Sequence, residues 1–123
     1  MIAVLPKDHP YAKADAYPLS LCSQEPFIMP ALGKDDVLEL FARFGLNPTI
    51  AYSTLECFAA FAMIENGLGM TITNRLITEG FQVDVVRIPV DPPQHISFGI
   101  MIPDKGALSP AAKRFVDYAK RII

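Results

Sequence analysis

One stretch near the middle of the chain, residues 53–74, constrains the fold most, because it predicts consecutive elements with defined ends. Ser53 and Glu56 have the spacing of a capping box, which predicts that a helix begins at Ser53. The residues that follow are nearly all apolar or small, so this helix should be covered on most sides. Gly67 can adopt the left-handed conformation that ends helices, and residues 70–73 then have the alternation of a strand.

The predicted start of this helix is also the best candidate for a binding site. The first backbone N–H groups of a helix have no partner within it, and the hydroxyls of Ser53 and Thr54 should lie beside them. Such a helix end attracts a small anion or a carboxylate. Capping alone also favours Ser at this position, so a structural cap and a ligand site are both open readings.

Short apolar runs and amphipathic stretches alternate along the rest of the chain, with prolines between them. The predicted strands are residues 1–5, 27–29, 49–52, 83–88 and 95–102. Further helices are predicted over residues 36–44, 74–79 and 110–122. Strands that alternate with helices through short connections predict an α/β fold, with helices on both faces of a sheet.

Two of these helices have clear end signals and an apolar stripe. Asp35 or Asp36 should cap the first helix and Gly45 should end it, while Ser109 followed by Pro110 should begin the last. In the first helix the expected buried face consists of Val37, Leu38, Phe41 and Phe44. In the last helix the apolar stripe consists of Ala112, Phe115, Val116, Ala119 and Ile122.

Composition excludes several classes of function. With 123 residues, of which 51% are hydrophobic, the chain has room for one domain with a real core. The net charge of −2 argues against non-specific attraction to nucleic acid or to an anionic membrane, and no apolar run is long enough to span a bilayer. Cys22 and Cys57 are far apart and lack the C-x-x-C spacing, which predicts reduced thiols and a cytoplasmic protein.

Motifs for catalysis, metals and cofactors are missing. His9 and His95, the only imidazoles, have no partner at ligand spacing, and no phosphate-binding, dinucleotide-binding or G-x-S-x-G motif occurs. A small hydrolase that uses Ser53 would lack a recognisable base. The sequence therefore predicts a binding protein without enzymatic activity, metal or cofactor.

Five motifs, in order along the chain, resemble the effector-binding domain of LysR-type transcriptional regulators. They are residues 4–12 (VLPKDHPYA), 25–29 (EPFIM), 44–50 (FGLNPTI), 53–56 with 66–72 (STLE and NGLGMTI), and 108–118 (LSPAAKRFVDY). One local departure is Asn74, where the family usually carries a proline.

The resemblance implies a periplasmic-binding-protein-like α/β lobe, with a mixed open sheet flanked by helices, from an incomplete two-lobe effector domain. On that map residues 1–103 are the second effector-binding subdomain and include both crossover strands, 1–6 and 96–103. Residues 104–123 are a C-terminal helix that belongs to the otherwise missing first subdomain.

The resemblance also implies a function: sensing of a small, anionic metabolite by a bacterial transcription regulator. DNA would be bound only through a helix-turn-helix domain that is absent from this chain. The effector is expected against Ser53 and Thr54, with Ala31 opposite and with Phe98 and Gly99 as the floor. The alternative is a solute-binding receptor of a transport system with the same fold, which an export signal upstream would reveal.

Self-association is the last expectation. The apolar stripe of the final helix would face water without the first subdomain, and the strand over residues 1–5 would leave an open sheet edge. We therefore expect a homo-oligomer, with a dimer as its simplest form.

Overall fold

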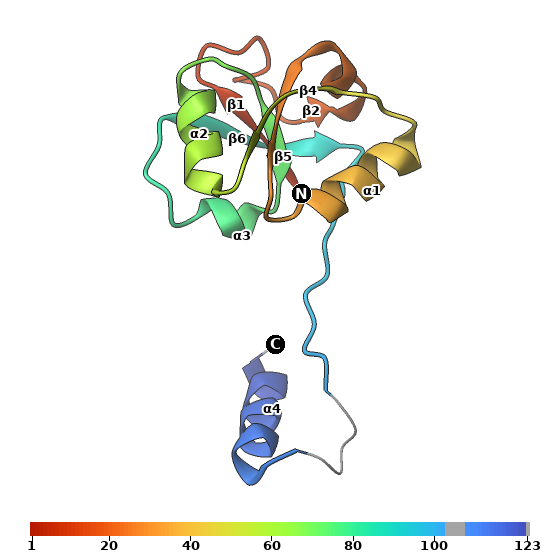
Figure 1. The fold of residues 1–123 in the computed structure, drawn as a ribbon, viewed down its shortest axis with the longest axis vertical. Coiled ribbons are helices and arrows are strands. Elements are labelled where there is room, and N and C mark those ends of the chain that lie inside the picture. The colour runs from red at the N-terminus through yellow and green to blue at the C-terminus, as the bar shows by residue number, and fades with distance from the viewer. Residues whose placement is uncertain (103–107, 123) are drawn as a thin grey trace.

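The computed structural model describes residues 1–102 and 108–122, in which a mixed sheet carries helices on both faces (Figure 1). The strands are β1 (Ile2–Pro6), β2 (Tyr17–Pro18), β3 (Pro26–Pro30), β4 (Thr49–Thr54), β5 (Thr71–Thr73) and β6 (Val85–Asp91). The helices are η1 (Leu19–Gln24, a 3-10 helix), α1 (Lys34–Phe44), α2 (Cys57–Glu65), α3 (Arg75–Thr78) and α4 (Pro110–Ile122). The predicted α/β lobe with a mixed sheet and flanking helices is confirmed.

Strand β1 lies in the middle of the sheet. It pairs antiparallel with β5 on one side and with β6 on the other, within the order β2-β6-β1-β5. Strands β3 and β4 pair in parallel, and a bridge between Phe27 and Met70 joins them to the β5 side. The expected open edge at residues 1–5 was wrong, because β5 and β6 supply both neighbours from distant parts of the same chain.

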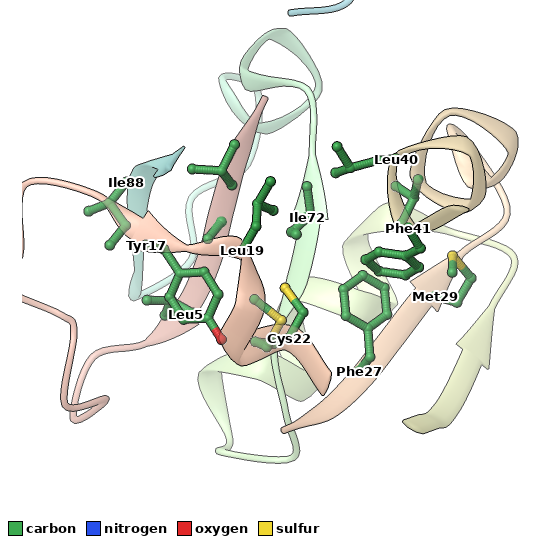
Figure 2. Close-up of a cluster of buried hydrophobic side chains, with 14 residues drawn as sticks. Leu5, Tyr17, Leu19, Cys22, Phe27, Met29, Leu40, Phe41, Ile72 and Ile88 are labelled. Carbon is green, nitrogen blue, oxygen red and sulfur yellow. The ribbon is translucent and has the colours of Figure 1, made fainter. Parts of the chain in front are cut away.

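Each face of β1 packs into its own apolar core. Ala3 and Leu5 face the larger cluster beneath η1 and α1, which also contains Phe27, Phe41 and Ile72 (Figure 2). The alternate residues of β1 face a second cluster on the opposite side, formed mainly by α2. This cluster consists of Ile2, Val4, Ile28, Cys57, Ala60, Phe61 and Ile64. A continuous apolar strand buried on both faces is what a central strand between two helix layers requires.

The N-cap of helix α2 lies three residues later than its sequence pattern predicts, at Glu56 instead of Ser53. Ser53 and Thr54 are the last residues of β4, because its pairing with β3 continues to Pro30 opposite Thr54. Glu56 is the N-cap of α2 and makes no side-chain capping bond, so the predicted capping box is wrong. Only one face of the helix is covered, since Phe58 is 59% exposed.

The predicted end of α2 is confirmed. Gly67 has a φ of 75°, and its N–H donates to the Ile64 carbonyl at 2.9 Å. The N–H of Leu68 donates to the Met63 carbonyl at 3.1 Å. This pair of bonds is the Schellman motif, which satisfies two carbonyls that the helix itself leaves unpaired.

Helix α1 also keeps its predicted end and changes its start. Gly45 ends it with a φ of 63°, but the N-cap is Gly33 rather than Asp35 or Asp36. The carboxylates of Asp35 and Asp36 lie in the first turn, where they interact favourably with the positive end of the helix dipole. The buried face was predicted only in part, because it consists of Val37, Leu40 and Phe41, while Leu38 and Phe44 are exposed.

The segment over residues 95–102 is not the long strand that its apolar alternation predicts. It forms no backbone hydrogen bond with another part of the described chain, although its extended path is seen in Figure 1. A strand needs a neighbour that bonds its backbone groups, and no described strand pairs with this segment. The second crossover strand is thus absent as a paired strand, and its last residue, Pro103, lies outside the described residues.

Helix α4 stands apart from the sheet in Figure 1. Ser109 accepts a hydrogen bond from the N–H of Ala112 at 3.2 Å, which confirms the predicted cap before Pro110. Val116 and Ala119 are buried, but Phe115 is 63% exposed and the stripe is therefore only partly covered. The domain boundary expected between residues 103 and 104 lies outside the described residues. None of the described helices is long and apolar enough to cross a membrane.

Candidate functional site

Three of the five predicted site residues meet where β3 and β4 end. The two strands are parallel, so the loops that follow them leave the same edge of the sheet. The N–H of Ala31 donates to the carbonyl of Thr54 at 2.8 Å, which holds the two loops together. Ala31, Ser53 and Thr54 line one cavity of about 240 Å³, together with Met29, Lys34 and Leu55.

This cavity combines polar groups with apolar walls. The Lys34 ammonium group supplies a positive charge, and the exposed Ser53 supplies a hydroxyl. The hydroxyl of Thr54 donates to the Glu56 carbonyl at 3.1 Å, so it retains only acceptor capacity for a ligand. Leu55, which is 84% exposed, forms an apolar rim. A small molecule with one anionic group and an apolar body matches this lining.

Phe98 and Gly99 do not join that cavity. Phe98 lies on the other side of the loop after β3, in a narrower space of about 90 Å³ beside Leu32, Gly33 and Asn74. Gly99 faces helix α4 instead, in a cavity lined by Phe98, Gly99, Ile100, Ile102, Val116 and Lys120. Phe98 therefore borders the candidate site through the shared loop, while Gly99 belongs to the junction with α4.

Sequence reasoning missed two residues at this edge. Lys34 is the first residue of α1, and the signal for it was a cation directly after the glycine in the loop that follows a strand. Asn74 follows β5, and its side-chain oxygen accepts the Leu76 N–H at 2.9 Å, which starts α3. The buried side-chain nitrogen of Asn74 has no partner among the described residues, so an acceptor placed there would be stabilising.

The imidazole of His9 serves the structure of the lobe. Its Nδ1 accepts the N–H of Tyr11 at 3.1 Å, so its Nε2 carries the proton and donates to Glu25 at 2.7 Å. The hydroxyl of Tyr17 donates to the other oxygen of Glu25, also at 2.7 Å. Burial, and then the bond to Glu25, raise the pKa of Tyr17. The network ties the turn after β1 to the strand β2.

The described residues include no recognisable catalytic or metal-binding group at this site. No imidazole lines the cavity that holds Ser53, so this hydroxyl has no base to activate it. No group of three or more His, Cys, Asp or Glu side chains in the described part of the chain is arranged to hold a metal ion. The arrangement suits reversible binding of a small anion.

The chain is similar to a known family of substrate-binding domains. The family model of the LysR substrate binding domain matches residues 1–122. An uncharacterized HTH-type transcriptional regulator of Bacillus subtilis strain 168, YvbU, is 28% identical over 125 residues, which cover 99% of this chain and 43% of YvbU.

Two solved structures share the fold. HinK, a LysR family transcriptional regulator from Pseudomonas aeruginosa, aligns with a TM-score of 0.77 and 24% identity over 98% of this chain and 43% of HinK. The effector-binding domain of QuiR in complex with shikimate gives a TM-score of 0.75 and 22% identity, over 98% of this chain and 59% of that domain.

The chain thus spans less than half the length of YvbU and of HinK. These relatives are transcriptional regulators, which favours the regulator over the transport receptor as the setting of this lobe. Since the family match runs through almost every residue, the chain belongs to the LysR substrate-binding domain family.

Proposed function

We propose that this chain is the ligand-sensing lobe of a cytoplasmic LysR-type regulator, and that it binds a small anionic metabolite without catalysis. The observation that carries the proposal is the cavity in which Ala31, Ser53 and Thr54 meet the positive charge of Lys34. The shikimate bound to the QuiR domain is a small carboxylate, which is the chemistry that a lysine and a hydroxyl recognise.

The cavity is one wall of a larger site in this proposal. Residues 1–103 act as the second subdomain, and residues 104–123 belong to a first subdomain that supplies the opposite wall. Phe98 lies on the segment that leads from one to the other, beside the loop after β3. Control of transcription would follow when a bound effector changes how the two subdomains close, and DNA would be contacted by a separate helix-turn-helix domain.

The test is a titration of the ¹⁵N-labelled chain with a panel of small carboxylates that includes shikimate, followed by amide NMR signals. We expect at least one ligand to shift the signals of Ala31, Lys34 and Thr54 in a saturable way. Lys34→Met and Ser53→Ala should each weaken that binding by about tenfold or more, because each removes a hydrogen bond to a charged group.

Two variants with matched changes away from the cavity serve as controls. Ser20→Ala removes an exposed hydroxyl on η1, and Lys113→Met removes an exposed charge on α4, so both should bind like the parent chain. Equal affinity in Lys34→Met, Ser53→Ala and the parent would contradict the site.

Homodimer formation is the second part of the proposal. Exposed apolar side chains on α4 support it, namely Phe115, Tyr118 and Ile122, and α1 with β4 exposes a second set, namely Leu38, Phe44, Ile50 and Tyr52. Light scattering after size exclusion should give twice the mass of one chain for the whole protein. For a chain that ends at Ile102 the measured mass should be closer to that of one chain. A monomeric mass for both chains would refute the dimer.

A further inference from the structure

A second cavity lies on the α2 and α3 side of the sheet, away from the loops that hold Ser53. Its volume is about 290 Å³, and its lining consists of Ile2, Arg75, Thr78, Glu79, Phe81 and Arg87. None of these residues lines the cavity at Lys34. Arg87 lies opposite Val4 in the β1–β6 ladder, so its side chain is on the same face of the sheet as Val4.

The guanidinium of Arg87 is held but not neutralised. Its Nη2 donates to the Phe81 carbonyl at 3.1 Å, while its buried Nε has no partner within the described residues. The two ion pairs of the described chain join Lys7 to Asp84 and His9 to Glu25, so they leave both arginines of this cavity unpaired. A partly buried cation without an ion-pair partner is costly, and a bound anion would offset that cost.

The remaining lining narrows the class of ligand. Phe81 packs edge-to-face on Phe61, with ring centroids 5.2 Å apart, and forms a fixed apolar wall together with Ile2. Thr78 uses its hydroxyl proton on the Arg75 carbonyl at 2.7 Å, so the donors toward a ligand come mainly from the two arginines. Glu79 adds one negative charge, which opposes ligands with several charges.

We propose that this cavity is a second anion-binding site, in which Arg87 and Arg75 hold the phosphate or carboxylate group of a small molecule. Arg87 is the main ligand because it is partly buried and fixed by Phe81, and the exposed Arg75 closes the site from α3. A guanidinium offers several N–H donors in one plane, which suits an oxyanion. The site is independent of the cavity at Lys34 and does not rest on the function proposed for it.

The experiment titrates the ¹⁵N-labelled 123-residue chain with orthophosphate, with phenyl phosphate, and with sodium chloride at matched ionic strength. We expect saturable shifts at Phe81 and Arg87 with both phosphates and not with chloride. Tighter binding of phenyl phosphate would identify an organic anion that uses the apolar wall, and equal affinity would identify a free inorganic anion.

Variants decide whether the arginines carry the binding. Arg87→Met should weaken phosphate binding by about tenfold or more, and Arg75→Met, which alters only an exposed side chain, should weaken it several-fold. Lys34→Met and Arg43→Met should leave it unchanged, which separates this site from the other cavity and from general charge. Equal phosphate affinity in Arg75→Met and the parent, or shifts no larger than those with chloride, would overturn the proposal even if Arg87→Met fails to fold.

Discussion

Strand β1 and helix α4 are both rich in apolar residues, yet they end in opposite environments. The four residues from Ile2 to Leu5 are at most 3% exposed, because strands pair on both sides of β1 and helices cover both of its faces. In α4 only Val116 and Ala119 are buried, while Phe115 and Ile122 are each more than 60% exposed. An apolar pattern therefore predicts which face of an element should be buried. Whether that face is buried depends on the other segments of the chain that pack against it.

The comparison also separates two kinds of stability. The lobe is held by contacts between residues far apart in sequence, such as the bridge from Phe27 to Met70. Helix α4 is held by its own hydrogen bonds, its cap at Ser109 and its contact with the segment before it. Substitutions in the lobe should therefore lower the free energy of unfolding far more than matched substitutions in α4.

The largest expected effect is in β1. Leu5→Ala removes a fully buried side chain from the larger core and should lower the free energy of unfolding by about 2–5 kcal/mol. Phe115→Ala removes a larger side chain from the exposed face of α4, and at a protein concentration at which the chain is monomeric it should change the free energy of unfolding by less than about 0.5 kcal/mol. Urea denaturation of both variants measures the contrast, and similar losses would show that α4 is integrated into the lobe.

A smaller effect is expected where β3 approaches β5. Gly69 has a φ of 153°, and a Cβ there would meet the backbone carbonyl of Pro26. Gly69→Ala should therefore cost about 1–3 kcal/mol, through strain and through loss of the neighbouring strand bridge. Gly99→Ala is the matched control, since nothing lies within 4 Å of a Cβ at that position. Equal thermal unfolding midpoints for the two variants would contradict this packing.

Alkaline pH should weaken the lobe through a buried thiol. Burial, followed by the charge of Glu25, raises the pKa of Cys22 from 9.0 to about 12. The folded chain therefore holds this proton where the unfolded chain releases it, so its contribution is complete below pH 9 and is lost toward pH 12. Between pH 8.5 and 10 the loss should be about 1 kcal/mol.

Chemical denaturation at the two pH values measures that loss, with Cys22→Ala as the comparison. The variant should lose less stability than the parent over the same interval, whatever its starting stability. An identical loss in both chains would mean that other groups cause the alkaline effect.

The smallest effect should come from removing α4. At a protein concentration low enough for the whole chain to be monomeric, a chain that ends at Ile102 should unfold at the same temperature as the whole chain, because α4 rests on the segment over residues 98–102. Brief chymotrypsin treatment of the whole chain should cut first after Phe98 or Met101, which are 69% and 95% exposed. A lower midpoint for the short chain, or first cuts inside the sheet, would show that α4 protects the lobe.

The sequence alone determined the features whose causes lie within a few residues. Gly45 and Gly67 end their helices as predicted, because a left-handed residue is needed at those positions and glycine adopts it without strain. Ser109 caps α4 through a bond to a residue three positions ahead. The apolar run after Met1 predicted a strand, and the five resemblance motifs placed the whole lobe in its family.

Tertiary structure decided the features whose partners are distant. The spacing of Ser53 and Glu56 suits a helix cap, but pairing with β3 keeps Ser53 in a strand and moves the start of α2 to Cys57. The alternation over residues 95–102 suits a strand, but no neighbour is present to pair with it in the described chain.

The candidate site follows the same division. Ala31, Ser53 and Thr54 were predicted from their places after two strands, and the parallel pairing of those strands brings them together. Lys34 joins them only because Gly33 turns the chain into α1 at that edge. Short-range signals are satisfied by the chain itself, whereas strand pairing and cavity walls need segments that only the folded chain brings into contact.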